Sequence, residues 1–198
     1  MPLRLVLIVI AAFAAGAFIA ALWVMPRASQ PVKLEAGSAL IGGPFSLTDH
    51  TGKRVTEADF RGRFMLVTFG FTYCPDVCPT ELQVMSAALE QLGDAAAKVT
   101  PVFITVDPAR DTPAQLAGYV SNFHPRLTGL TGTAEEIKAA AKAFRIYYAQ
   151  VKDPSSAAEY TMDHSALVYL MDPDGKYLAH FPYGTKAEDM AAKIRQFL

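Results

Sequence analysis

The chain has little of several residue types, and each shortage excludes a class of protein. Only two of its 198 residues are cysteine, so it is not a disulfide-dense scaffold. Charged residues make up 19%, and 18 basic against 19 acidic residues leave a net charge of −1, without the basic excess of nucleic-acid binders. Hydrophobic residues, at 52%, are too many for a disordered chain. The length suits one globular domain with an appendage.

Much of the apolar excess lies at the N-terminus. From Leu5 to Met25 the chain has 21 consecutive residues without a charge, and a helix of that length could span a hydrocarbon core about 30 Å thick. Trp23 suits an interfacial position. A cleaved signal peptide is the alternative, although its apolar segment is usually shorter. We therefore predict a membrane anchor within residues 1–27, with a transmembrane helix at about residues 5–25.

The remaining chain is predicted to be a tether followed by one soluble domain. Residues 28–39 are largely polar, contain Pro31, and are predicted to be a tether. Residues 40–198 are predicted to fold. Without residues 1–27 the chain keeps 16 basic and all 19 acidic residues, a net charge of −3, which is ordinary for a soluble domain. A second short polar run, Asp153–Glu159, is predicted to be a loop.

Strand patterns alternate with helix patterns along this domain. Apolar runs at Phe64–Phe69 and Val99–Val106 predict two buried strands. Two further runs flank the DPDG turn, at Ala166–Met171 and Tyr177–Phe181, and predict a hairpin. A shorter hairpin is expected within residues 45–56.

Four helices are expected between and after these strands. Their start signals are an N-cap followed by proline at Thr112, and capping boxes opening at Thr133 and Thr185. The predicted helices are Pro79–Leu92, Thr112 to about Phe123, Thr133 to about Phe144, and one from Thr185 onward. The element order predicts an α/β domain, a central mixed sheet with helices on both faces, in the thioredoxin arrangement.

Both cysteines lie in residues 69–80, FGFTYCPDVCPT, between a predicted buried strand and a predicted helix. Strand carboxyl ends are where open α/β sheets place ligand sites, and a helix N-terminus favours thiolate over thiol. Cys74 and Cys78 can close a disulfide or share a metal ion. A purely structural disulfide is the weaker interpretation, because linking residues four apart removes little chain entropy, about 2 kcal/mol.

One of the four histidines is a candidate third ligand. His164 lies just before the strand predicted at Ala166–Met171, and its loop could fold over the cysteines. Two thiolates and one imidazole suit copper, whereas a structural zinc site would usually have four protein ligands. The sequence therefore favours copper over zinc. The other three histidines are expected to be solvated: His50, His124 and His180.

Four further residues are weaker candidates. Asp107 could line the site or face a partner, but turn and cap chemistry is the favoured interpretation for it and for Asp111. Met162 could be a soft ligand, although packing is the more common role of methionine. Asp163 could hydrogen-bond around the site.

Four blocks of the sequence resemble the Sco/SenC family, in order and at plausible spacing. They are FGFTYCPDVCPTEL, VFITVDPARDTP, LTG and MDHSALVYLMDPDGKYL, and the resemblance extends over residues 42–197. The family consists of membrane-anchored, thioredoxin-fold copper proteins of cytochrome c oxidase assembly. The resemblance places the family's two cysteine ligands on Cys74 and Cys78 and its histidine ligand on His164. The Asp-Pro-x-Arg-Asp-Thr block of the family falls on Asp107–Thr112.

The resemblance also implies a function and a location. It implies a protein that delivers Cu(I) or Cu(II) to the dinuclear copper site of cytochrome c oxidase, or that reduces the cysteines of that site. The implied partners are the copper-site subunit and an upstream copper donor. The implied location is a bacterial inner membrane, spanned once, with the soluble domain in the periplasm.

Two enzymatic alternatives remain open at the level of sequence. Cys74 and Cys78 could be the redox-active dithiol of a metal-independent thiol–disulfide oxidoreductase. A peroxiredoxin-like peroxidase is the other alternative. His164 discriminates between the interpretations, because a copper site needs it and a dithiol reductant does not.

Overall fold

The structure is a computed structural model that describes residues 41–152 and 159–198. The predicted anchor and tether, residues 1–39, lie outside the described residues, as does most of the loop predicted at Asp153–Glu159. Within the described ranges, no helix combines the length and the apolar character needed to cross a bilayer.

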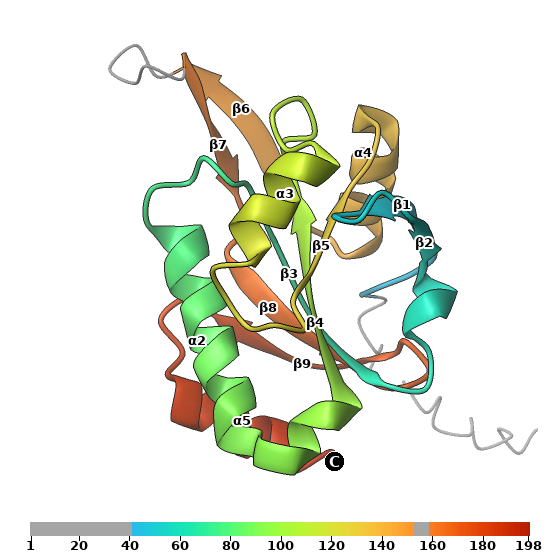
Figure 1. Cartoon of the computed structure of the whole chain (residues 1–198), viewed down its shortest axis with the longest axis vertical. Coiled ribbons are helices and arrows are strands. Elements are labelled where there is room, and N and C mark those ends of the chain that lie inside the picture. Colours follow the sequence, from blue (N-terminus) through green and yellow to red (C-terminus); the bar gives the residue numbers. More distant parts are fainter. Residues whose placement is uncertain (1–40, 153–158) are drawn as a thin grey trace, which may run out of the picture. The chain divides into compact units, whose positions relative to one another are not determined.

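A seven-stranded sheet runs through the domain in the order β2-β1-β5-β4-β3-β8-β9 (Figure 1). The central strands β3, β4 and β5 are parallel, while β8, β9, β1 and β2 are joined antiparallel at the two sides. The sheet is therefore mixed, as predicted. The strands are β1 (Ser46–Asp49), β2 (Arg54–Thr56), β3 (Phe64–Gly70), β4 (Val99–Thr105), β5 (Thr128–Thr131), β8 (Leu167–Met171) and β9 (Tyr177–Pro182).

Helices cover both faces of this sheet, which also confirms the prediction. The helices are α2 (Val77–Leu92), α3 (Pro113–Val120), α4 (Ala134–Ala143) and α5 (Ala187–Arg195), with short 3-10 turns η1 (Glu57–Phe60) and η2 (Gly93–Lys98). One apolar cluster joins α2, α3 and α5 to Leu66 and Phe103. The other joins α4 to Val67 and Phe69. Because β3 and β4 are covered on both faces, they are buried along nearly their whole length, and most of their side chains are apolar.

The helix start signals have different outcomes. Thr112 accepts a hydrogen bond from the Gln115 backbone, and Thr133 forms a complete capping box, so α3 and α4 begin as predicted. The capping box predicted at Thr185 is wrong. Helix α5 has Lys186 as its N-cap with no side-chain bond, because the Thr185 hydroxyl donates to the Pro182 carbonyl in the turn after β9.

Two features were not anticipated from the sequence. Strand β5 is one, and the hairpin of β6 (Tyr148–Lys152) and β7 (Tyr160–His164) is the other. The hairpin is a separate two-stranded sheet that extends beyond the main one in Figure 1. Its strands are half-buried or exposed and lack a clear apolar alternation. His164 therefore ends a strand instead of lying in a loop.

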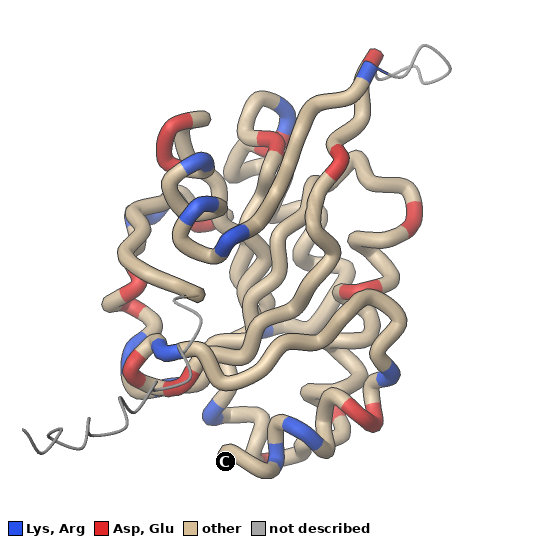
Figure 2. The backbone as a smooth tube through the Cα atoms, turned by 180° about the vertical axis from the view of Figure 1, so that it is seen from behind, with Lys and Arg blue, Asp and Glu red and all other residues tan. Residues whose placement is uncertain are grey.

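Charged residues of both signs are distributed along the backbone, as the opposite view shows (Figure 2). No large region of the described backbone carries one sign alone in this view. This distribution agrees with the absence of a basic excess in the composition.

Candidate metal and dithiol site

The cysteines lie where β3 passes into α2. Cys74 is in the loop, where its backbone N–H donates to the Phe71 carbonyl at 3.2 Å. Helix α2 begins at Val77, two residues before the predicted start, so Cys78 lies in its first turn and is buried. A Cβ built on Gly70 would be 2.8 Å from the Cys78 sulfur, so a glycine at the end of β3 permits this close approach.

Three of the predicted site residues converge. The Cys78 backbone N–H donates to the Cys74 sulfur at 3.4 Å, and the Cys78 sulfur lies 3.4 Å from His164 Nε2. Both cysteines are free. His164 Nδ1 lies 3.1 Å from the Ser165 carbonyl oxygen, which can only accept. The proton of a neutral His164 ring therefore belongs on Nδ1, which leaves Nε2 free to bind a metal ion. In the protonated ring Nε2 also carries a proton and can donate it to the Cys74 thiolate.

The two thiols have opposite pKa shifts. A hydrogen bond from the Cys78 side chain lowers the pKa of Cys74 to about 4, against the effect of burial, with further hydrogen bonds from His164 and from backbone groups. The same contact with Cys74, together with burial, raises the pKa of Cys78. Cys74 is thus a thiolate at neutral pH, while Cys78 keeps its proton. Burial lowers the pKa of His164, but hydrogen bonds to Cys74 and Ser165 outweigh it and the net shift is upward.

A buried glutamate beneath the cysteines was missed by the sequence analysis. Glu81, one turn after Cys78, accepts a hydrogen bond from the Thr68 hydroxyl at 2.7 Å, and its Oε1 has no hydrogen-bond partner. Burial raises the pKa of this carboxyl despite the bond from Thr68. The sequence did contain a signal for the burial of Glu81, because this residue is in phase with the apolar positions Leu82 and Met85 on the buried face of α2.

The two aspartates of the β4–α3 loop are buried, and neither side chain caps α3, whose N-cap is Thr112. Asp111 is fully buried and accepts hydrogen bonds from Thr105 and from both the backbone and hydroxyl of Thr72. Thr72 precedes Cys74 by two residues, so Asp111 ties the β4–α3 loop to the cysteine loop. Asp107 forms an ion pair with Arg110 and accepts a hydrogen bond from the Tyr160 hydroxyl at 3.0 Å.

The remaining candidates lie in other surroundings. Met162 packs against the core, as expected of a methionine, and Asp163 is exposed.

The other three histidines differ in exposure. The Nδ1 atom of His50 accepts a hydrogen bond from the Gly129 backbone, and that of His124 accepts one from the Arg126 backbone. Both residues are half-buried, so the prediction of simple solvation was wrong for them. His180 is exposed as predicted and pairs with the Tyr177 hydroxyl.

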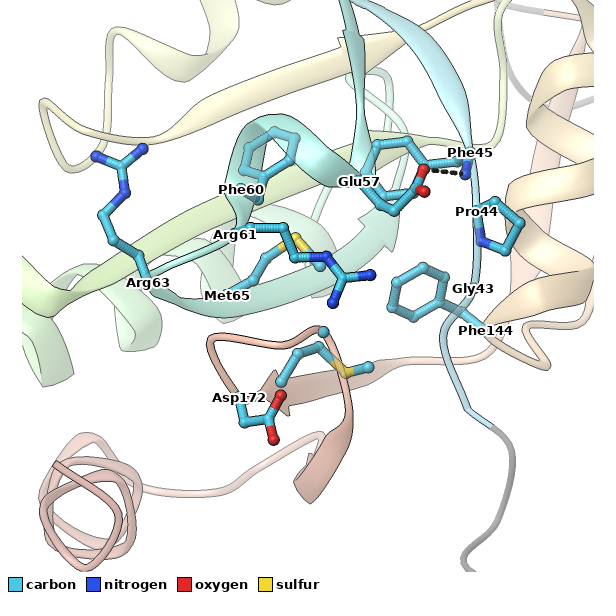
Figure 3. A pocket seen from close by; sticks show the side chains of 12 residues that line it. Gly43, Pro44, Phe45, Glu57, Phe60, Arg61, Arg63, Met65, Phe144 and Asp172 are labelled. Carbon is cyan, nitrogen blue, oxygen red and sulfur yellow. Dashed lines mark hydrogen bonds between the residues drawn. The ribbon is translucent and has the colours of Figure 1, made fainter.

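A separate pocket lies near the opposite end of β3 (Figure 3). It measures about 110 Å³, and Arg61 points into it beside Met65 and Phe144. Its lining contains neither cysteine nor histidine. Of this pocket and the cysteine site, only the cysteine site, at the C-terminal end of β3, contains thiol and imidazole groups.

The convergent donors fit a metal ion only after a small adjustment. In residues 41–152 and 159–198, no group of three or more His, Cys, Asp and Glu side chains is arranged as a ready-made metal site. An ion bound tetrahedrally at about 2.3 Å from sulfur and about 2.0 Å from nitrogen would separate those donors by roughly 3.5 Å. The Cys78 sulfur and His164 Nε2 are 3.4 Å apart. Binding of an ion between these two donors therefore requires loss of the Cys78 proton and little change in their separation.

Sequence comparisons identify similar proteins. Residues 34–198 match the family model described as SCO1/SenC. Protein sco1 of Schizosaccharomyces pombe is 46% identical over 177 residues, which cover 88% of this chain and 67% of that protein. The human protein described as SCO1 homolog, mitochondrial, is 45% identical over 161 residues, covering 80% and 53%. The chain thus spans about half to two thirds of the length of these relatives.

Solved structures that are similar to this chain carry descriptions of the same kind. Arabidopsis thaliana ScoI with copper bound has a TM-score of 0.75 and 42% identity, covering 79% of this chain and 96% of that one. Bradyrhizobium japonicum ScoI with copper bound has a TM-score of 0.73 and 46% identity, covering 80% and 99%. BsSco, described with a disulfide switch and as a member of the Sco family of cytochrome c oxidase assembly proteins, has a TM-score of 0.62 and 27% identity, covering 79% and 92%.

Proposed function

The chain belongs to the SCO1/SenC family, and we propose that it binds one copper ion through Cys74, Cys78 and His164 and delivers it to the dinuclear copper site of cytochrome c oxidase during assembly. The observation that carries this proposal is the convergence of two cysteine sulfurs and a histidine nitrogen at the end of β3. Similar proteins have been solved with copper bound. Two thiolates and an imidazole suit Cu(I), and an added ligand would accommodate Cu(II).

The three proposed ligands differ in whether they must lose a proton before they can bind copper. Cys74 is already a thiolate at neutral pH, and Ser165 holds the His164 ring with Nε2 available. Cys78 must release its proton when copper binds, so affinity should fall as pH falls. Oxidation to a Cys74–Cys78 disulfide would remove both thiolates and abolish binding.

The same dithiol supports reduction of the target's cysteines as part of this role. The Cys74 thiolate would attack a sulfur of the target disulfide and form a mixed disulfide, which Cys78 then resolves after losing its proton. Two electrons pass to the target, and Cys74 and Cys78 become oxidised. A metal-independent thiol–disulfide oxidoreductase or peroxidase would need only this chemistry. The contact between His164 and Cys78 favours copper, because such enzymes have no need of it.

The location and partners are part of the proposal. We propose that residues 5–25 anchor the protein once in a bacterial inner membrane, with the domain of residues 40–198 in the periplasm. The uncharged run of 21 residues supports the anchor. The proposed partners are the copper-site subunit of the oxidase and an upstream copper donor.

Anaerobic copper titration of the reduced, detergent-solubilised full chain tests the ligands. We expect one Cu(I) per chain, measured against a competing chelator. His164→Ala should weaken binding by roughly 10-fold or more, and Cys74→Ala or Cys78→Ala should abolish tight binding. His180→Ala is the matched control and should bind as wild type does, because His180 pairs with Tyr177.

Two outcomes would contradict the proposal. If His164→Ala and Cys78→Ala bind copper as tightly as wild type, the ligand assignment is wrong. If cells carrying His164→Ala assemble the oxidase normally and the purified variant reduces disulfides at the wild-type rate, the metal-independent oxidoreductase is the better description.

A further inference from the structure

The hairpin that carries His164 is weakly joined to the domain. Strands β6 and β7 pair with each other and with no strand of the seven-stranded sheet. A cleft of about 440 Å³ lies between the hairpin and the loops that follow β4 and β5, lined by Tyr148, Gln150, Tyr160 and Met162 on the hairpin side. Tyr148 and Met162 pack against the core but are themselves only partly buried. The position of His164 over the cysteines therefore depends strongly on any contact that bridges this gap.

Arg110 makes such a contact with polar groups. Its Nη1 donates to the Tyr160 backbone carbonyl at 3.1 Å, and its Nε donates to Asp107. The Tyr160 hydroxyl closes a ring by donating to Asp107 at 3.0 Å. The ion pair is largely buried, with 15% of the arginine side chain and 4% of the aspartate side chain exposed. A shielded ion pair of this kind is weakened little by salt.

Arg110 also makes stacking contacts, and these reach both halves of the site. Its guanidinium carbon lies 3.8 Å from the ring centroid of Tyr160 and 4.7 Å from that of Tyr73. Tyr73 directly precedes Cys74, while Tyr160 is four residues before His164 on β7. Phe71, at 5.9 Å from the guanidinium, in turn meets the His164 ring edge-on. One guanidinium therefore contacts the cysteine loop and the histidine hairpin together.

We propose that Arg110 is a positioning residue, which fixes the His164 hairpin against the cysteine loop and so determines how well His164 holds copper. The inference rests on the proposed function for its copper readouts, though not for its structural one. A planar guanidinium can donate to two acceptors in fixed directions while stacking on aromatic rings. A lysine ammonium keeps the charge beside Asp107 but loses that fork and most of the stacking.

The first measurement needs no copper. Amide hydrogen exchange of the reduced, copper-free full chain compares wild type with Arg110→Lys and Arg110→Met. We expect residues 160–164 to exchange roughly 10-fold faster in both variants, while β3 and β4 keep their protection. Arg63→Gln is the matched control, because Arg63 is exposed at the far end of β3.

The second measurement reads the copper site. We expect Arg110→Lys to release Cu(I) to a chelator roughly 10-fold faster than wild type, within the range found for groups that orient metal ligands. Its Cu(II) electron paramagnetic resonance spectrum should shift toward that of His164→Ala. In the His164→Ala background, Arg110→Lys should add little further loss, because Arg110 acts through His164.

The outcomes separate the two proposals. If wild type binds copper but Arg110→Lys matches it in exchange, release rate and spectrum, the positioning role is overturned and the proposed function stands. If wild type does not bind copper, the proposed function fails, and the exchange comparison still decides whether Arg110 fixes the hairpin. Where Arg110→Met does not fold, because Asp107 is left buried without its cationic partner, the Arg110→Lys comparison decides.

Discussion

Cys74 and Cys78 carry the same functional group, but their surroundings give them different proton affinities. Cys74 accepts hydrogen bonds from the Cys78 side chain, His164 and backbone N–H groups, which stabilise its thiolate. Cys78 is buried against Gly70 and Phe71, and it faces the charge of that thiolate. At the residue scale, Cys74 is therefore the reactive thiolate, and Cys78 is the protonated thiol that reacts second.

Alkylation of the reduced full chain with iodoacetamide should show this difference. Because the pKa of Cys74 is lowered to about 4, its thiolate persists at neutral pH, and its reaction rate should fall only as pH drops through about 4. Mass spectrometry after digestion assigns the modified cysteine. We expect Cys74 to be modified and Cys78 to be protected.

Paired variants test the cause of the shift. Cys78→Ala removes the strongest stabilising hydrogen bond, so the alkylation midpoint of Cys74 should move upward. Cys78→Ser keeps a hydroxyl donor and should leave the midpoint closer to that of wild type. A wild-type midpoint near the ordinary cysteine pKa, about 8.5, would contradict the assignment.

Two segments have the same Thr-x-x-Glu motif, but only one of them forms a capping box. Thr133 and Glu136 exchange side-chain and backbone hydrogen bonds at the start of α4. Thr185 and Glu188 have the same spacing, but Thr185 bonds backward to Pro182. At the element scale, a capping motif acts only where the preceding chain leaves its hydroxyl free.

Threonine-to-alanine substitutions at these two positions should differ in effect. Thr133→Ala removes a working N-cap and should lower the free energy of unfolding by about 1 kcal/mol. Thr185→Ala should cost less, because its hydroxyl caps no helix. Urea unfolding followed by circular dichroism gives both values. Equal losses, or a larger loss at Thr185, would show that the two motifs are not distinguished in this way.

The sheet separates two apolar clusters, which lie on its opposite faces. Leu66 belongs to the cluster beneath α2, α3 and α5, and Leu130 to the cluster beneath α4. Both side chains are fully buried. Because β3 and β4 contribute side chains to both clusters, the two faces should unfold together at the scale of the whole molecule.

Leucine-to-alanine substitutions on the two faces test this coupling. Leu66→Ala and Leu130→Ala should each lower the free energy of unfolding by about 2–5 kcal/mol. Each should still show one transition, coincident by circular dichroism and tyrosine fluorescence. Val151→Ala, at a side chain that is 45% exposed, should change stability by less than about 0.5 kcal/mol. Two separate transitions in either leucine variant would contradict the coupling.

Predictions from the sequence succeeded where the signal was local. The apolar runs of β3, β4, β8 and β9 predicted these strands, and Gly93 marked the end of α2. The cysteine motif predicted a dithiol at a strand-to-helix junction. The place of His164 before a predicted strand made it the candidate third ligand, as the resemblance also implied, and the structure brings its Nε2 to 3.4 Å from the Cys78 sulfur. The hairpin β6–β7 was missed because its half-buried or exposed strands carry little periodic signal.

Residue order was sufficient for the α/β class, the mixed sheet and the place of the dithiol, because these follow from short-range periodicity and from which residues adjoin a strand end. The contact of His164 with Cys78 and the bridge from Arg110 to Tyr160 depended on the fold. Each of these results from contacts between segments far apart in the chain, here the cysteine motif, the β4–α3 loop and the β6–β7 hairpin. Hydrogen-bond geometry and desolvation exist only once those segments have come together, so no local pattern encodes them.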